Sequence, residues 1–143
     1  MSKGNTFEND LLKLIFQAVA IADIAEDDTT SPLTNLYVSL HTADPGEAGD
    51  QTTSEATYTG YARVAVARTA SGWAVTNNIA DNVAAITFGA CTAGSNTITH
   101  FAVGTASSGA GKILYSGALT ASLAVSAGIT PQFAIGVCDC TED

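Results

Sequence analysis

Short runs in which apolar residues occupy every second position begin at Asn35 and recur to residue 138. In the first run Leu36, Val38 and Leu40 alternate with more polar residues. A period of two places alternate side chains on opposite faces of the chain, which is typical of a half-buried strand. We therefore predict about eight strands. Their cores are residues 35–41, 61–66, 73–75, 83–88, 98–103, 113–115, 119–125 and 133–138.

Turn residues (Gly, Asn and Ser) separate these runs, and no second helical stretch lies between strands. This pattern predicts a mostly β fold, an antiparallel β-sandwich or jelly roll, and disfavours a parallel α/β sheet. The longest irregular segment is residues 43–60, with a turn signal at Asp44-Pro45-Gly46. Long loops in compact domains are usually functional, so we expect this lobe to reach a neighbouring subunit.

The N-terminal part predicts one amphipathic helix over residues 6–24, with Phe7, Leu11, Leu14 and Ile15 on one stripe. Further apolar residues widen the stripe, which indicates burial on more than one side. An acidic run at residues 26–28 marks the end of the helix. The predicted organisation is an N-terminal helix with an acidic linker (1–34) and a β-sandwich (35–143), together a single domain.

Charged residues make up 13% of the 143 residues, against about 25% in a typical soluble domain. A surface of this kind is easily desolvated and loses little side-chain entropy on contact, which favours assembly. The alternative is a soluble monomer with a Thr- and Ser-rich surface. The net charge of −9 disfavours partners that are nucleic acids or anionic membranes. The apolar stretch 11–22 is shorter than the roughly 20 residues that a membrane span needs, and acidic residues precede it, unlike a signal peptide.

No pattern in the chain indicates catalysis. Each of the two histidines, His41 and His100, falls within a predicted strand, where a hydrogen-bonded scaffold role is expected. The stretch GTASSGAGK at residues 104–112 resembles a phosphate-binding loop but lacks the first glycine and the final hydroxyl of that motif. We interpret it as a glycine-rich hairpin loop. A carboxylate pair for glycan hydrolysis stays open, because nothing singles out one pair among 14 acidic residues.

No metal or cofactor site is predicted either. Asp44, Glu47 and Asp50 miss the spacing of a calcium loop and are expected to be solvated loop charges. The three cysteines, of which Cys138 and Cys140 are two apart, are too few for a structural zinc site and are expected to be reduced thiols.

Arg63 and Arg68 flank a predicted strand on opposite faces, in a chain with five basic residues. Each could form a bidentate pair with a carboxylate across a subunit contact. The alternative is an ordinary surface ion pair. The predicted interface residues are therefore Phe7, Leu11, Leu14, Ile15, Arg63 and Arg68.

Four segments resemble motifs in small proteins of tailed bacteriophages, whose relatives are often labelled tail fibre proteins. They are LYVSLHTADPG (36–46), EATYTGYAR (55–63), LYSGALT (114–120) and ITP (129–131). The size and strand pattern also resemble the jelly-roll cement protein of a short-tailed phage. That resemblance implies a structural virion protein without enzymatic activity or cofactors, made in the host cytoplasm and located on the outer capsid surface.

Its implied partners are the major capsid protein and itself, as a homotrimer. The main alternative is a tail fibre or tail-associated adhesion component, in which exposed aromatic residues would bind a host polymer. Trp73 and Tyr58 are the suggestive aromatics for that role. A third alternative is an enzyme such as a glycan hydrolase.

Overall fold

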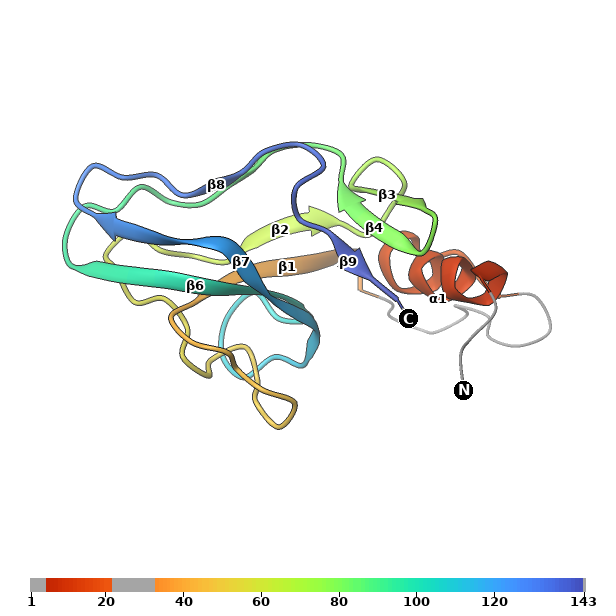
Figure 1. Cartoon of the computed structure of the whole chain (residues 1–143), viewed down its shortest axis with the longest axis horizontal. Coiled ribbons are helices and arrows are strands. Elements are labelled where there is room, and N and C mark those ends of the chain that lie inside the picture. Colours follow the sequence, from red (N-terminus) through yellow and green to blue (C-terminus); the bar gives the residue numbers. More distant parts are fainter. Residues whose placement is uncertain (1–4, 22–32, 143) are drawn as a thin grey trace. The chain divides into compact units, whose positions relative to one another are not determined.

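The computed structural model describes residues 5–21 and 33–142, which form one helix and nine strands (Figure 1). The predicted class, a mostly β antiparallel sandwich with one N-terminal helix, is confirmed. The elements are α1 Asn5–Gln17, β1 Asn35–His41, β2 Val64–Ala67, β3 Trp73–Thr76, β4 Ile79–Asn82, β5 Ile86–Thr87, β6 Ser95–Gly104, β7 Ile113–Ser126, β8 Gln132–Phe133 and β9 Cys140–Thr141.

Contacts within the chain group its residues into two compact units, each made of segments that are distant in sequence. Unit 1 comprises Met1–Asn35, Val66–Ala85 and Phe133–Asp143, and unit 2 comprises Leu36–Ala65 and Ile86–Gln132. The predicted organisation, with a boundary after residue 34 inside a single domain, stays a prediction.

The largest sheet has four strands in the order β2-β1-β6-β7. β1 pairs antiparallel with β6, with Val38 opposite Val103 and Leu40 opposite Phe101. Leu36, Val38 and Leu40 are buried, as their alternation predicts. The short strands β5 and β8 form a separate pair. Phe88 follows β5, and its ring stacks on that of Tyr61 at a centroid distance of 6.3 Å.

An irregularity divides β7. Ile98 pairs with Leu123 and His100 with Ala118, so two steps along β6 match five along β7 and β7 carries three extra residues. These residues, within 119–122, form a bulge opposite Thr99 that bends the strand. The two strands predicted at 113–115 and 119–125 are thus one interrupted strand.

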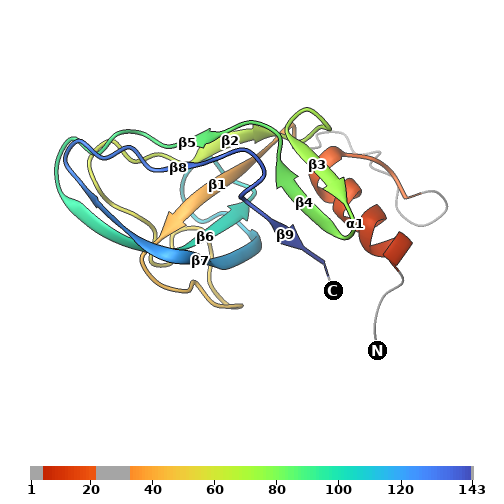
Figure 2. The same cartoon turned by 45° about the horizontal axis from the view of Figure 1, so that its top comes forward.

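In unit 1 the helix packs on the β3–β4 hairpin (Figure 2). Leu12 and Phe16 are fully buried, and the Phe16 and Trp73 rings meet edge to face at 4.7 Å. Asn77 and Asn78 both have positive φ, 50° and 56°, and form the tight hairpin turn. Asparagine tolerates this conformation better than other non-glycine residues.

α1 ends at Gln17, earlier than the predicted residue 24, and residues 22–24 lie outside the described range. Ala18 takes the left-handed conformation, with φ 55°. The Arg68 guanidinium donates hydrogen bonds to the carbonyl oxygens of Leu14 and Ile15. These carbonyls have no partner within the helix, and a cation there also complements the helix dipole. The helix therefore ends at a tertiary contact, which the apolar periodicity of the sequence does not encode.

Replacing Ala18 by glycine is expected to raise the free energy of unfolding by about 0.5–1 kcal/mol, because glycine adopts the left-handed conformation without a Cβ penalty. Urea unfolding of Ala18→Gly beside Ala20→Gly measures this. Ala20 is also exposed but lacks positive φ, so its substitution gains nothing. Equal effects of the two substitutions would contradict the role given to Ala18.

Three further predicted strands have other bounds in the structure. In the run 61–66 the strand starts at Val64 and continues to Ala67. In the run 83–88 only Ile86–Thr87 is a strand, and β4 lies earlier, at Ile79–Asn82. In the run 133–138 the strand ends at Phe133, and a turn follows. The alternation of Phe133, Ile135 and Val137 therefore does not place them on one face: Phe133 is buried, whereas Ile135 and Val137 are exposed.

Candidate assembly surface

His41 and Ser39 lie next to each other on the polar face of β1. The Ser39 hydroxyl is 2.9 Å from His41 Nε2, and His41 Nδ1 is 2.8 Å from the carbonyl oxygen of Thr53. A carbonyl only accepts, so we assign the proton to Nδ1, and the Ser39 hydroxyl donates to Nε2. The pair has the geometry of a nucleophile with its base, but both side chains are fully buried. This burial agrees with the hydrogen-bonded scaffold role that the sequence predicts for His41.

Burial lowers the pKa of His41 below its usual 6.5, against the opposing effects of the Thr53 carbonyl and Glu55. The unfolded chain therefore binds a proton that the folded chain does not, and stability falls as the pH drops below about 6.5, by at most ~1.4 kcal/mol per pH unit. Urea unfolding at about pH 7.5 and about pH 5.5 is expected to show this loss. His41→Gln should reduce the pH dependence, and an unchanged pH dependence in this variant would count against the assignment.

Arg63 joins three segments of unit 2. Its Nε and Nη2 donate to the two carboxylate oxygens of Glu55 at 2.6 and 2.8 Å. Its Nη1 and Nη2 also donate to the carbonyl oxygens of Ala106 and Gly109 at 2.9 and 2.8 Å. The Tyr61 hydroxyl donates to Glu55 Oε1 at 2.9 Å, and burial raises the pKa of Tyr61. This bidentate, nearly buried pair fixes the loop 42–60 against the loop 105–112.

Gln51 fills the space between the same two loops, which lie side by side in Figures 1 and 2. Its amide donates to the Tyr37 carbonyl and accepts from the Ala106 N–H. A Cβ at Gly104 or Gly111 would lie 2.2 or 2.1 Å from the Gln51 amide. The glycines of the 104–112 segment therefore admit a glutamine side chain. The segment is the β6–β7 hairpin loop, as its sequence predicts, and Gln51 occupies its interior.

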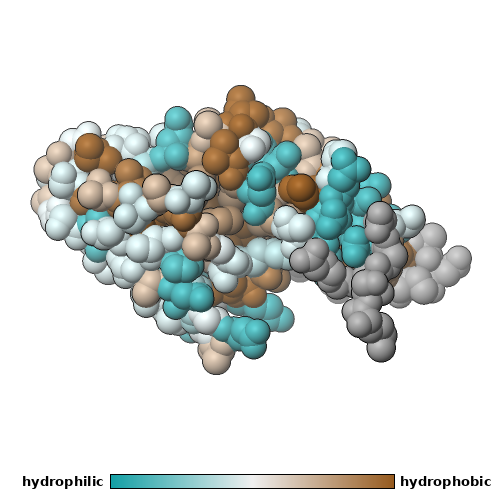
Figure 3. All heavy atoms as spheres, viewed as in Figure 1, coloured by the Kyte–Doolittle hydropathy of each residue, from teal (hydrophilic) through white to brown (hydrophobic). Residues whose placement is uncertain are grey.

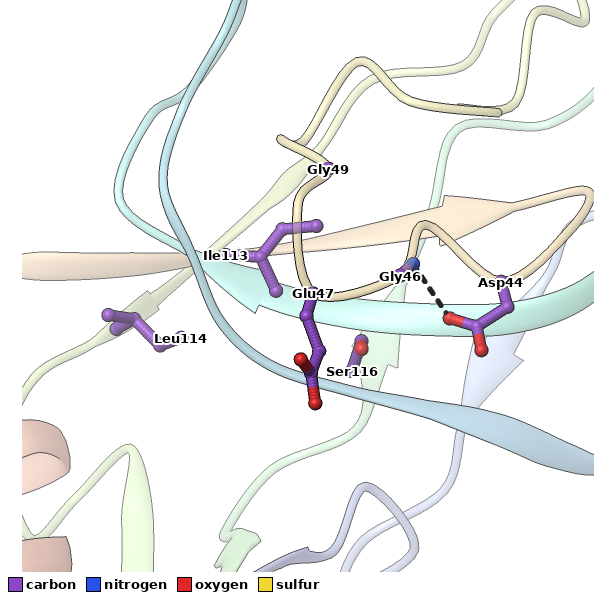
Figure 4. Close-up of a pocket in the computed structure, with 7 residues that line it drawn as sticks. All are labelled: Asp44, Gly46, Glu47, Gly49, Ile113, Leu114 and Ser116. Carbon is purple, nitrogen blue, oxygen red and sulfur yellow. Dashed lines mark hydrogen bonds between the residues drawn. The ribbon is translucent and has the colours of Figure 1, made fainter.

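A pocket of about 390 Å³ lies beside this lobe, lined by loop residues after β1 and by the start of β7 (Figure 4). Asp44 Oδ1 accepts a hydrogen bond from the Gly46 N–H at 2.9 Å. The apolar side is formed by Ile113 and Leu114. Within residues 5–21 and 33–142 no group of three or more histidine, cysteine or acidic side chains is arranged to hold a metal ion.

Asp50, expected to be a solvated loop charge, has hydrogen-bond partners within the chain, and the three thiols are buried. Asp50 accepts hydrogen bonds from the N–H and hydroxyl of Thr52, which lower its pKa. Cys91, Cys138 and Cys140 are buried and free. A hydrogen bond with Cys138, together with burial, raises the pKa of Cys140, which keeps it a thiol at neutral pH.

The surface of β7 carries no charge over a long stretch. Between Asp81 and Asp139 the only charged side chain is Lys112. Residues 118–124, which we call the uncharged β7 surface, are Ala, Leu, Thr, Ala, Ser, Leu and Ala, and all except Leu119 are exposed. Short neutral side chains lose little hydration and little entropy when covered, so this strand is the best candidate for an assembly surface.

The predicted interface residues lie in both units. Phe7 is exposed, and Leu11, Leu14 and Ile15 are half-buried on α1. Arg63 and Arg68 bond within their own units, as described above. The interface role of all six residues stays a prediction. Trp73 and Tyr58 are buried, and no helix among the described residues is long and apolar enough to cross a membrane.

One resemblance segment, EATYTGYAR at 55–63, consists largely of residues that hold the fold. It begins with Glu55 and ends with Arg63, the two members of the ion pair. Between them, the Tyr58 hydroxyl donates to the Gly89 carbonyl oxygen at 3.0 Å. At Gly60, with φ 102°, a Cβ would lie 2.2 Å from the Ala90 carbonyl oxygen. Residues of this motif therefore make contacts that hold the fold together.

Comparison with known proteins agrees with this structural interpretation. No curated protein matches the chain. A family model described as Gp80, podophage GP4 fiber I protein gp80, matches residues 2–141, nearly the whole length. A fibre protein of a short-tailed phage is a structural component of the virion. The chain belongs to the Gp80 family, that of the podophage GP4 fiber I protein.

Proposed function

We propose that this protein is a structural subunit of a short-tailed phage fibre and that it works by assembly through the uncharged β7 surface. The family match supports a fibre component. The observation that carries the assembly role is the absence of charge between Asp81 and Asp139 apart from Lys112, in a chain of net charge −9. Copies of such a chain repel each other elsewhere, and a neutral strand provides a surface where contact costs little.

Direct binding of a host polymer by stacked aromatic rings is not favoured. Among the described residues no Trp or Tyr is exposed: Trp73 and Tyr58 are buried, and Tyr37, Tyr61 and Tyr115 are half-buried. Sugar rings stack on exposed aromatic faces, and among the described residues Phe7 is the one exposed aromatic side chain, so we assign the chain to the body or attachment of the fibre and not to its adhesive tip.

A second candidate function is capsid cement on the outer face of the major capsid protein, with the chain as a homotrimer. The same neutral surface and lack of exposed Trp or Tyr in the described residues favour this role. Oligomers multiply weak contacts through effective concentration, which suits a protein that reinforces a shell.

Counting and locating the chain in purified virions separates the two functions. Quantitative mass spectrometry with antibody labelling in electron microscopy is expected to find few copies, on the tail. Copies in numbers comparable to the major capsid protein, spread over the shell, would establish the cement role. Absence from the virion would overturn both.

The uncharged β7 surface is tested by Thr120→Glu and Leu123→Glu, which place charges where assembly needs none. Both side chains are exposed, so the fold should tolerate the changes. We expect loss of the chain from virions in a complementation assay, with an unchanged melting temperature. Val19→Glu, at an exposed apolar residue in unit 1, is the matched control. Normal incorporation of both β7 variants would exclude this strand as the assembly surface.

A further inference from the structure

Unit 1 exposes a cluster of large apolar side chains on the turn between β8 and β9. Ile135 is 68% exposed and Val137 56%, and Val83, which follows the residue whose carbonyl accepts from the Gly136 N–H, is 39% exposed. In Figure 3 hydrophobic residues gather at the upper edge of the view, over the segment that joins β8 and β9. We call Val83, Ile135 and Val137 the apolar knob. Single exposed apolar residues are common, but a cluster of this kind marks an interaction site.

One buried side chain holds this turn in place. Asn82 Oδ1 accepts from the N–H groups of Val137 and Cys138, at 3.1 and 2.9 Å. Its Nδ2 donates to the carbonyl oxygens of Ala84 and Ala134, both at 2.8 Å. The backbone carbonyl of Asn82 also accepts from the Gly136 N–H at 2.9 Å. This backbone bond holds Asn82, the residue before Val83, against the turn.

This frame fixes the direction of the knob. Phe133 and Cys138 are buried on either side of the turn, and the bonds to Asn82 leave residues 134–137 no freedom to turn Ile135 and Val137 inward. A partner that covers the knob therefore gains apolar burial without ordering a mobile loop, and preorganisation of this kind raises affinity.

Charge around the knob identifies the kind of partner. Asp139, which follows the turn, is exposed, and Asp81 is half-buried beside Asn82. The described part of unit 1 holds two basic side chains, Lys13 and Arg68, and the Arg68 guanidinium bonds to helix carbonyls. Two copies joined through their knobs would bring the four aspartates together, which is unfavourable.

We propose that the apolar knob docks into an apolar pocket, rimmed by lysine or arginine, on a different protein of the same virion. This inference rests on the proposed structural role in the virion and adds the attachment point and the chemistry of its partner. The knob lies in unit 1, apart in sequence from the uncharged β7 surface of unit 2, so the chain has one surface for each of two neighbours.

A photo-crosslinking amino acid at position 135 tests the proposal in assembled virions. We expect a cross-link to a different virion protein, at a peptide that contains lysine or arginine. The same amino acid at position 123, on β7, is the control and should give a different product. A cross-link from position 135 to a second copy of the chain, or none in virions that contain the chain, would overturn the proposal.

A double substitution gives an independent test. Ile135→Ser with Val137→Ser leaves the melting temperature unchanged, because both side chains are exposed, and lowers incorporation into virions by about tenfold or more. Val19→Ser with Ile129→Ser, also exposed, is the control and keeps normal incorporation. Normal incorporation of the knob variant would refute the docking role alone, whereas absence of the wild-type chain from virions would refute the proposed function as well.

Discussion

Replacing Arg63 by alanine is expected to lower the free energy of unfolding by about 3–5 kcal/mol, because it leaves a nearly buried carboxylate without its cation. The change removes both hydrogen bonds to Glu55 and the bonds to the carbonyl oxygens of Ala106 and Gly109. The loops 42–60 and 105–112 then lose their common anchor. Urea unfolding measures the cost, and hydrogen exchange should show faster exchange in residues 105–112.

Two further variants make the Arg63 result specific. Arg63→Lys keeps the charge but lacks the planar fork that matches a carboxylate, so it should recover only part of the stability. Lys112→Ala removes an exposed charge from the neighbouring loop and is expected to change stability by no more than about 0.5 kcal/mol. If Arg63→Ala cost no more than Lys112→Ala, the ion pair would not anchor the lobe.

Replacing Asn82 by alanine is expected to cost about 3–4 kcal/mol, since it leaves backbone groups of the β8–β9 turn without their hydrogen-bond partners. The N–H groups of Val137 and Cys138 lose their acceptor, and the carbonyls of Ala84 and Ala134 lose their donor. The apolar knob loses its fixed orientation together with its frame. Thermal unfolding measures the stability, and limited proteolysis within residues 134–138 measures the opening of the turn.

Asn82→Asp separates the two halves of this network. Aspartate still accepts from Val137 and Cys138, but its second oxygen would face the carbonyl oxygens of Ala84 and Ala134 in a buried site, so its cost at neutral pH should be at least that of alanine. Asn35→Ala, which removes only a weak exposed bond of 3.4 Å to Thr34, serves as the control and should be nearly neutral. Equal stabilities of the Asn82→Ala and Asn35→Ala variants would show that Asn82 does not hold the turn.

The strands that the sequence predicts well are those whose alternation is local and uninterrupted. β1 lies where the run at 35–41 predicts it, and β6 covers the run at 98–103 and extends over Ser95–Gly104. The sequence pattern does not predict β4, because Asp81 and Asn82 are residue types that are typical of turns. Two adjacent asparagines at 77 and 78 are the signal that could have located its hairpin.

The helix end and the apolar knob depend on contacts between distant segments, which periodicity does not encode. Arg68 bonds to helix carbonyls 53 and 54 residues away, and Asn82 bonds to Cys138 across 56 residues. The sequence does single out Arg63 and Arg68 as unusual in an acidic chain. It does not show that Glu55 and the helix end are their partners, because both pairings arise only when the fold closes.

The bulge in β7 limits how further chains could pair with this strand. A neutral strand on the rim of a sheet is a template on which further chains could add without limit, as in amyloid. The three extra residues opposite Thr99 break the regular spacing of backbone donors and acceptors along that rim. In the proposed assembly, neighbours would cover β7 through their side chains, and the interrupted ladder opposes continued strand addition of the amyloid kind.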